Sequence, residues 1–353
     1  MTTYTAQSRI ALADPEAVLV PLCEHMSEHG ARLERSNGMR ILRFAHGHVQ
    51  FQQSTGATHV EVTADDVEGL YFLRLNVAAH ILEFSGDETP RIEWNGDGGA
   101  LERPPNFQVF TVLHAYDVTP HMRRITFQAE DVTRFARMDA LHLNILVQHA
   151  DLPEPQWPRV GENGLMQWDD PGRRPHFRKY TVRSLDLSAR TVDIDFVLHT
   201  DAGPGSGLAL SARPGDEIGV VGPGGGGLSE ADWYLFLGDE TALPAIARML
   251  EYLPDTACGK VFIEVADRNE VQAIANRSAI DVQWLLRNGA MAGSTSCLID
   301  AVREAAFPAD GTRIFVWCGC EFEAFRAIRG HLRAERGLDK QEHLVVSYWR
   351  REE

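Results

Sequence analysis

The chain has 353 residues, a length that predicts two or three domains, and its composition, 44% hydrophobic and 24% charged, is typical of globular proteins. Its net charge of −16 argues against general nucleic-acid binding, which needs a broad basic surface, but not against a local basic pocket for a small anion. The sequence shows no apolar run of about 18 residues and no signal-peptide pattern, and its five scattered cysteines are typical of reduced thiols, so we expect a cytoplasmic protein.

The first hundred residues predict a small α+β domain over residues 1–100. Asp14 as N-cap, Pro15 at the first helical position and Gly30 beyond the end indicate a helix. The runs "MRILRF", "HVQFQQ" and "HVEVTA" predict strands, and "ADDVEGLYFLRLNVAAHILEF" predicts a second helix. The Gly- and Pro-rich stretch near residues 96–106 predicts a linker.

Residues 104–228 predict a six-stranded antiparallel β-barrel. The strands are expected in "FQVFTVLHAY", "MRRITFQ", "LHLNILVQ", "KYTVRSL", "TVDIDFVLH" and "EIGVVGP". A closed barrel suits short strands of this kind because closure leaves no exposed sheet edge. The long Pro-rich segment at 149–175 predicts a lid or a surface loop.

Residues 229–353 predict an α/β domain with a parallel sheet. Strand patterns such as "WYLFLG", "KVFIEVA" and "RIFVWC" alternate with helical patterns such as "ALPAIARMLEYL" and "EFEAFRAIRGHLRAERG". In such sheets ligands bind at the carboxyl ends of the strands.

The stretch "RPHFRKYTVRSLD" concentrates positive charge in an acidic chain. Arg178 could hold a pyrophosphate through two parallel hydrogen bonds, Tyr180 could lie against a flavin ring, and Thr181 could hydrogen-bond to that ring. Spacing alone favours an ordinary exposed strand.

Two further segments could meet a nucleotide. The N–H groups of Gly203, Gly205 and Ser206 could cradle phosphate oxygens, although a barrel turn also needs glycine. In "GDETALPAI", a strand runs into a helix whose first amides could meet a nucleotide, or whose polar residues could simply cap the helix. Glu264, at the end of a strand, could bind ribose hydroxyls, whereas Arg268 could favour a 2′-phosphate.

No metal site and no catalytic nucleophile or base is predicted. The pair Cys318 and Cys320 lacks a second Cys/His pair at suitable spacing, so we interpret it as small-residue packing. His46 and His48 alternate on one strand and are interpreted as surface or partly buried histidines.

Taken together, these motifs resemble those of the siderophore-interacting protein family, FAD-binding ferric-siderophore reductases within the ferredoxin-NADP reductase superfamily. The resemblance covers residues 104–350 and is carried by "RKYTVR", "GPGS", "GDEIGVVGP", "GDETALPAIARMLEYLP" and the terminal "SYWR". It implies a FAD-binding barrel at 104–228 and an NAD(P)H-binding domain at 229–353. The first hundred residues resemble a domain of unknown function sometimes fused ahead of such reductases.

The resemblance implies that FAD passes electrons from NADPH or NADH to a ferric siderophore and thereby releases Fe(II). The flavin carries this chemistry, so no catalytic side chain is expected. Two alternatives stay open: a general flavin or ferric-chelate reductase, and a siderophore-binding flavoprotein reduced by a partner such as a ferredoxin.

The resemblance also implies two sets of site residues. The cofactor-binding set is Arg178, Tyr180, Thr181, Val182, Arg183, His199, Gly203, Gly205, Ser206, Asp239, Glu240, Thr241 and Ala242. The candidates for holding an anionic ferric siderophore are Arg173, Arg174, Lys179 and Arg350. The chain departs from the family pattern at Asn144, where a lysine is common, and at Cys320, near the expected nicotinamide contact.

Overall fold

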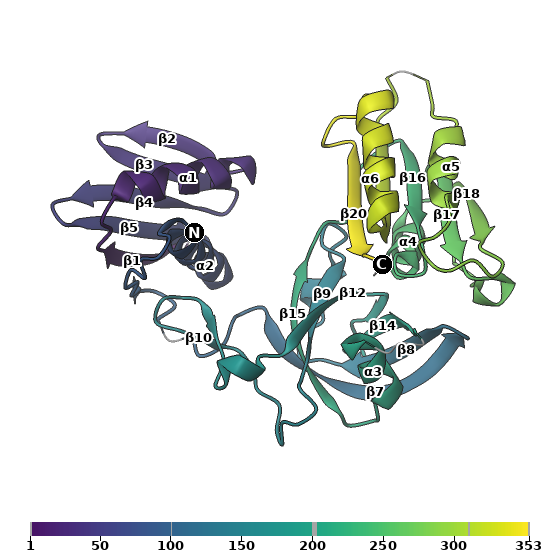
Figure 1. Ribbon diagram of the computed structural model, residues 1–353, viewed down its shortest axis with the longest axis horizontal. Helices are drawn as coiled ribbons and strands as arrows, with labels where there is room; N and C mark the ends of the chain where they lie inside the picture. Colours follow the sequence, from purple (N-terminus) through teal and green to yellow (C-terminus); the bar gives the residue numbers. More distant parts are fainter. Residues whose placement is uncertain (1, 100, 200–202, 310, 352–353) are drawn as a thin grey trace. The chain divides into compact units, whose positions relative to one another are not determined.

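The computed structural model describes residues 2–99, 101–199, 203–309 and 311–351. By its contacts the chain forms two compact units (Figure 1). The N-terminal unit comprises Met1–Phe107 and Gln148–Arg174, and the C-terminal unit comprises Gln108–Val147 and Pro175–Glu353. Each unit is described by itself.

The N-terminal unit is a mixed α+β structure, as its sequence pattern predicts. Its helices are α1 (Pro15–Glu28) and α2 (Val67–Phe84). Its sheet, in the order β2-β3-β4-β5-β1-β6, consists of β1 (Tyr4–Ile10), β2 (Arg32–Ser36), β3 (Met39–Phe44), β4 (Gly47–Ser54), β5 (Ala57–Ala64) and β6 (Asn95–Gly96). The Asp14 carboxylate caps α1 by accepting hydrogen bonds from the backbone N–H groups of Glu16 and Ala17, as expected.

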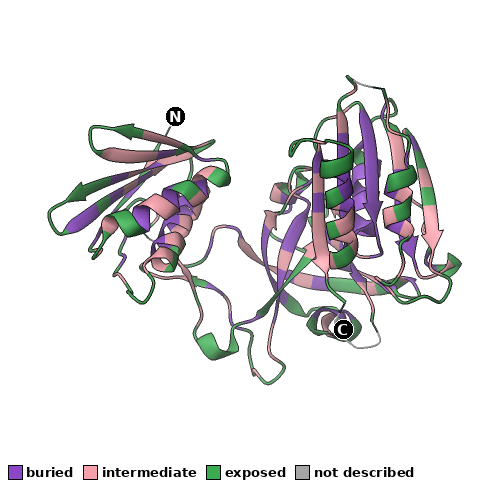
Figure 2. Ribbon diagram, turned by 45° about the horizontal axis from the view of Figure 1, so that its top comes forward, coloured by how far each residue is buried: buried purple, intermediate pink, exposed green. Residues whose placement is uncertain are grey.

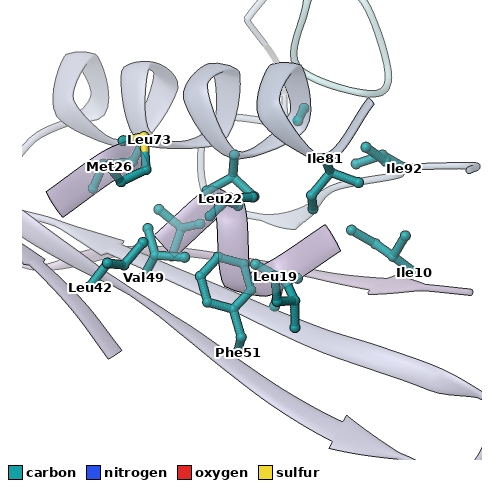
Figure 3. Packing of buried hydrophobic residues seen from close by; sticks show 14 of the residues in the cluster. Ile10, Leu19, Leu22, Met26, Leu42, Val49, Phe51, Leu73, Ile81 and Ile92 are labelled. Atoms are coloured by element: carbon teal, nitrogen blue, oxygen red, sulfur yellow. The ribbon is translucent and has the colours of Figure 1, made fainter. Parts of the chain in front are cut away.

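The core of this unit lies between the two helices and the sheet (Figure 3). Leu19 and Leu22 of α1 are fully buried, because they recur at a spacing that keeps them on one helical face. They pack in one cluster with Phe51 of β4 and Ile81 of α2. The two helices also pack against each other.

The Pro-rich segment between the barrel strands belongs by its contacts to the N-terminal unit. It contains β10 (Arg159–Val160), β11 (Met166–Gln167) and a 3-10 turn, η2 (Pro171–Arg173). Trp94 donates a 2.9 Å hydrogen bond from its indole to the carbonyl of Asn163, and Val160 donates a 3.0 Å bond to the carbonyl of Glu102. The segment is thus packed onto the first hundred residues, a placement that its composition does not reveal.

The first half of the C-terminal unit is the antiparallel barrel sheet, in the order β12-β9-β15-β7-β8-β14-β13. Its strands are β7 (Phe107–Thr119), β8 (Met122–Gln128), β9 (His142–Val147), β12 (His176–Thr181), β13 (Ser184–Asp186), β14 (Thr191–Val197) and β15 (Glu217–Gly224). All six predicted strands are present, but the segment "KYTVRSL" is divided between β12 and β13 at Val182 and Arg183. Because these two strands stand at opposite ends of the sheet order, this short stretch of chain connects the two edges of the barrel sheet.

Two short helical elements accompany the barrel. They are the 3-10 turn η1 (Thr133–Ala136) and the helix α3 (Pro204–Ser211). The sequence predicted a small-residue loop where α3 begins, since glycine is a poor helix former. The fold holds this helix by a 3.1 Å hydrogen bond from the Ser206 hydroxyl to the carbonyl of Val197.

The second half of the C-terminal unit is a parallel sheet in the order β18-β17-β16-β19-β20. Its strands are β16 (Trp233–Gly238), β17 (Cys258–Val265), β18 (Ala279–Leu286), β19 (Ile314–Glu321) and β20 (His343–Trp349). Its helical elements are α4 (Leu243–Tyr252), η3 (Arg268–Glu270), α5 (Cys297–Glu304), α6 (Phe322–Gly330) and the π-helical turn η4 (His331–Glu335). Helix α4 covers one face, and α5 and α6 cover the other (Figure 1). The central strands are buried, while α5 and α6 expose their outward sides (Figure 2).

Barrel and parallel sheet are joined by buried polar contacts within the C-terminal unit. The guanidinium of Arg248, on α4, donates a 3.0 Å hydrogen bond to the carbonyl of Val182 and a 2.5 Å bond to that of Phe135. Burial lowers the pKa of Arg248 to about 10, which leaves it charged at neutral pH. Glu270 accepts a 2.6 Å bond from the Thr119 hydroxyl.

Among the described helices, none is long and apolar enough to cross a membrane.

Candidate functional site

A cavity of about 770 Å³ lies in the C-terminal unit, where β9, β12, β14, α3 and the end of β20 meet. The predicted site residues that line it are Arg178, Lys179, Tyr180, Thr181, His199, Gly203, Gly205, Ser206, Thr241 and Arg350. The lining residues that sequence reasoning did not select are His142, Asp195, Val197, Pro204, Pro244, Val346, Ser347, Tyr348 and Trp349. This volume lies within the range of small-molecule and cofactor sites, about 300–1,000 Å³.

Two cationic side chains of β12 line the cavity. Arg178 and Lys179 are exposed, and Arg178 donates a 3.0 Å hydrogen bond to the neighbouring carbonyl of Phe177. Within the described ranges, neither side chain forms an ion pair with a carboxylate. Asp195 also lines the cavity, but Arg124 binds both of its oxygens, at 2.6 and 2.8 Å. Arg178 and Lys179 therefore line the cavity without a described carboxylate partner, whereas the negative charge of Asp195 is neutralised by Arg124.

Asn144 of β9, the position where a lysine is common in the family, lies opposite a lysine of the neighbouring strand. In the antiparallel register it pairs with Lys179 of β12. Directly opposed residues of antiparallel strands project from the same face with Cβ atoms about 5 Å apart. A cation is therefore present one strand away from the place where the family pattern has lysine.

Tyr180 forms an aromatic wall of the cavity. Its ring packs on Phe196 with the centroids 4.3 Å apart, and burial raises the pKa of its phenol to about 12. Gly205 lies against the phenol so closely that a Cβ atom there would collide with the Tyr180 hydroxyl. Glycine at this position is thus required by the close approach of α3 to β12.

The N-terminus of α3 faces the same cavity. Gly203 is its N-cap, and glycine has no side chain that could cap the first N–H groups of the helix. The first backbone N–H groups of a helix lack intrahelical partners and carry partial positive charge. Together with the cations of β12, this helix end suits a negatively charged ligand.

The C-terminal strand closes another side of the cavity. Tyr348 lies 2.5 Å, Oη to Nε2, from His142 of β9. Burial raises the pKa of Tyr348, whereas burial and the charges of Lys179 and Arg248 lower the pKa of His142 to about 4. Near neutral pH the phenol is therefore protonated and donates to a neutral imidazole. Arg350, the next cation along, lies over the ring of Phe322 at 3.7 Å.

Asp239 lies behind this wall and is fully buried. It accepts hydrogen bonds from the Thr241 N–H at 2.9 Å and from the Trp349 indole at 2.8 Å. Burial nevertheless raises the pKa of its carboxyl to about 6, since removal from water penalises the ionised form. Asp239 positions Thr241 and Trp349 and does not itself line the cavity.

Four other predicted cofactor-binding residues also lie outside the cavity lining. The guanidinium of Arg183 binds Glu251 through two hydrogen bonds of 2.6 and 2.8 Å, and Val182 is buried in the barrel core. Glu240 forms an ion pair with Arg287, and Ala242, the N-cap of α4, is buried. Arg287 also lies 3.5 Å from Glu264, whose other oxygen accepts a 2.7 Å bond from Thr295. These groups are engaged in holding the strand ends together.

Two of the predicted substrate cations belong to the N-terminal unit. Arg173 lies 3.1 Å from Asp151 and 3.9 Å from Asp170, so its charge is compensated there. The carbonyl of Arg174 lies 3.1 Å from the His149 ring. Neither residue is among those that line the cavity.

Cys318 and Cys320 are buried in the parallel sheet with their sulfur atoms 3.7 Å apart. The neighbouring Cys318 thiol and, after it, burial raise the pKa of Cys320. This is the small-residue packing that the sequence indicated.

Sequence reasoning missed His142 and most of the C-terminal strand. His142 carries no sequence signal, because its place beside Tyr348 depends on the contact between two domains. The "SYWR" string supported the resemblance, yet only its arginine was assigned to the site. Its aromatic residues, Tyr348 and Trp349, form one side of the cavity.

Three family models match consecutive parts of the chain. Residues 231–352 match siderophore-interacting protein, residues 111–227 match siderophore-interacting FAD-binding domain, and residues 7–95 match an uncharacterized protein conserved in bacteria.

Curated relatives match the reductase part. Ferric vibriobactin reductase ViuB of Vibrio cholerae is 30% identical over 237 residues, which are 66% of this chain and 86% of ViuB. The NADPH-dependent ferric-chelate reductase of Escherichia coli is 28% identical over 255 residues, covering 69% of this chain and 92% of that enzyme.

Solved structures show the same fold over that part. A siderophore utilization protein from T. fusca superposes with a TM-score of 0.63 and 38% identity, over 71% of this chain and 96% of that chain. The siderophore-interacting protein SipS from Aeromonas hydrophila superposes with a TM-score of 0.59 and 29% identity, over 70% and 93%.

Proposed function

Since the chain belongs to the siderophore-interacting protein family, we propose that it is an FAD-dependent reductase that takes electrons from NADPH or NADH and releases Fe(II) from ferric siderophores. The observation that carries the proposal is the cavity in which the free cations of β12, the N-terminus of α3 and the aromatic wall of β20 meet. The names of ViuB and of the Escherichia coli enzyme support this reaction class.

The residues of the cavity fit FAD. A dinucleotide needs cations and N–H groups for its pyrophosphate and an apolar surface for its ring system. Arg178 and the first turn of α3 supply the former, and Tyr180 supplies the latter. The close packing of Gly205 on Tyr180 sets the first turn of α3 directly beside the ring of Tyr180, so the phosphate-binding N–H groups and the aromatic surface lie next to each other.

Bound FAD supplies the conversion of a two-electron hydride donation into single-electron transfers to Fe(III). The chain's own residues would bind and orient FAD and would exclude water from it. Arg178 would hold the pyrophosphate, Tyr180 would support the ring system, and Tyr348 and Trp349 would shield it from solvent, since all four residues line the cavity. Thr241 lines the cavity, and its hydroxyl donates a 2.5 Å hydrogen bond to the Asp239 carboxylate, which fixes its orientation.

Lys179 and Arg350 suit the electrostatic needs of the substrate. A ferric siderophore is anionic when its oxygen ligands carry more than three negative charges, and cations near the site raise the local concentration of such a complex despite the overall negative charge of the protein. Reduction weakens binding of iron to such hard oxygen ligands, which releases it. Arg173 and Arg174 remain weaker proposals for this role, because Arg173 is already paired with carboxylates.

The domain roles follow from the same proposal. Residues 104–228 would bind FAD and residues 229–353 the nicotinamide donor, with residues 1–100 as an additional domain. We also propose, from the sequence, that a ferredoxin could be an alternative electron donor. The sequence likewise supports a cytoplasmic location. The described cysteines are all free thiols, which agrees with a reducing compartment.

An anaerobic absorption experiment tests the function. Purified protein, loaded with FAD if required, should show a flavin spectrum that bleaches with NADPH or NADH and returns on addition of ferric siderophore, with Fe(II) trapped by a ferrous chelator. Protein that neither contains nor takes up FAD would refute the proposal. A flavin that bleaches only with a reduced ferredoxin would identify the other donor, and turnover of simple ferric chelates alone would identify a general reductase.

A further inference from the structure

Three histidines of the N-terminal unit form a cluster that the reductase function does not use. His25 and His29 lie four residues apart near the end of α1, and His80 lies on α2. The ring centroids of His25 and His29 are 4.5 Å apart, and those of His25 and His80 are 4.8 Å apart. His25 and His80 are half-buried and His29 is exposed, so the cluster is open to solvent on one side.

The helices explain why these rings meet. Residues four apart on an α-helix project from the same face, which brings His25 and His29 together. Helix α2 packs against α1 and contributes the third ring. Phe84, one turn beyond His80, stacks on its ring at 6.2 Å and forms an apolar wall on one side.

One ring nitrogen of His80 is held by a backbone hydrogen bond. Its Nδ1 lies 2.6 Å from the backbone carbonyl of Asn76. A carbonyl can only accept, so Nδ1 carries a proton, and in the neutral imidazole Nε2 then keeps its lone pair. This hydrogen bond is the outer-shell contact that commonly fixes the tautomer of metal-binding histidines.

The spacing of the rings matches a shared metal ion. With a metal–nitrogen distance of about 2.1 Å, each imidazole centroid lies about 3.2 Å from the metal, so two such centroids lie ~4.5–5.2 Å apart for ligand angles between 90° and 109°. The two observed spacings, 4.5 and 4.8 Å, agree with this range.

We propose that His25, His29 and His80 bind one divalent first-row transition-metal ion, such as Zn²⁺. As the side chains stand, no three described His, Cys, Asp or Glu residues are arranged to hold a metal ion, so coordination requires the rings of His25 and His29 to turn about their Cβ–Cγ bonds, which redirects the ring nitrogens and leaves the centroid spacings nearly unchanged. Such rotamer changes are fast in accessible side chains and cost little. A set of three imidazoles suits Zn²⁺, Ni²⁺ and Cu²⁺ and leaves a coordination position for water. The proposal is independent of the proposed reductase function.

Calorimetric titration with Zn²⁺ of untagged, chelator-stripped full-length protein tests the site. Wild type should bind one equivalent that His25→Ala, His29→Ala and His80→Ala each weaken at least ~10-fold, since losing even an outer-shell partner costs ~10–100-fold. His59→Ala is the matched control, because it removes an exposed imidazole elsewhere in the same unit and should bind Zn²⁺ like wild type. Zn²⁺ should also raise the melting temperature of wild type and of this control.

Unchanged Zn²⁺ binding in the three cluster variants, or no binding by wild type, would overturn the proposal. Circular dichroism in chelator establishes that each variant is folded. His29 is exposed, so its substitution leaves the core intact and decides the question if His25→Ala or His80→Ala fails to fold.

Discussion

Two segments of the C-terminal unit match the same family pattern but use their charges differently. On β12, Arg178 and Lys179 face the cavity without a carboxylate partner among the described residues. At the end of β16, Asp239 is bonded by Thr241 and Trp349, and Glu240 is paired with Arg287.

This difference separates ligand-binding groups from supporting groups. A side chain whose hydrogen bonds are already satisfied internally gains little by binding a ligand, whereas an uncompensated cation gains a charge-assisted bond. We therefore expect substitutions on β12 and α3 to change cofactor and substrate binding. Substitutions behind β16 should change stability first.

Gly205→Ala should give the largest effect. Its Cβ would collide with the Tyr180 hydroxyl, so Tyr180 or α3 must move, at a cost of ~1–3 kcal/mol of stability and with loss of bound FAD. Gly207→Ala is the matched control on the same helix, where the added Cβ meets nothing within 4 Å and alanine should stabilise by up to ~1 kcal/mol. Thermal melts and the flavin content of the purified variants measure both effects. Equal melting temperatures and equal flavin contents in the two variants would contradict the role of Gly205 in shaping the FAD site.

Arg178→Ala should weaken FAD binding by ~10–100-fold while leaving the fold intact, because a charge-assisted hydrogen bond contributes ~1.5–3 kcal/mol. Fluorescence titration of the apoprotein with FAD measures the dissociation constant. Arg313→Ala is the control, since this exposed arginine pairs with Asp232 far along the chain from β12. An unchanged FAD affinity in Arg178→Ala would remove its assignment to the pyrophosphate.

Asp239 should make stability depend on pH. Its folded-state pKa is about 6, above the ordinary 3.8, so the folded state binds more protons than the unfolded state between these values. This group's contribution to the free energy of unfolding therefore falls as pH rises from about 4 to about 6 and is constant above that. Denaturant unfolding across this range should show the slope in wild type.

Asp239→Asn should remove that slope. It should also lower stability by ~1–3 kcal/mol at neutral pH, because its amide N–H₂ must face a donor, either Thr241 or the Trp349 indole. A variant with the wild-type pH slope would show that another group is responsible.

Lys179→Ala should give the smallest effect. It should slow reduction of an anionic ferric siderophore by ~2–5-fold at low salt, as expected for one exposed charge contributing ~0.2–1 kcal/mol. The salt dependence of the rate should decrease as well. Lys340→Ala, an exposed lysine outside the cavity, should match wild type; a similar loss in both variants would assign the effect to net charge.

Much of the fold is visible in local patterns. Asp14 and Pro15 begin α1 because capping and proline geometry act within a few residues, and the alternating pattern of β14 reflects one buried face. Helix α3 was missed because its glycines lower helix propensity, and the division between β12 and β13 was missed because barrel closure is not a local property.

The candidate site was predictable only in part. The sequence identified Arg178, Tyr180 and Gly205 through motifs that lie on single elements. It could not separate them from Arg183 or Glu240, whose partners Glu251 and Arg287 come from other elements. Whether a charge is free or compensated depends on residues distant in sequence.

By itself the sequence determined the order of domains, the class of each and the family, because periodicity, capping and motif strings are local. Only the tertiary structure decided which charges face the cavity, that the segment 148–174 packs on the N-terminal unit, and that His80 joins His25 and His29. The i, i+4 pair of histidines stands in the sequence, but the third ring comes from another helix. Contacts between elements carry no local signature, and binding sites are built from such contacts.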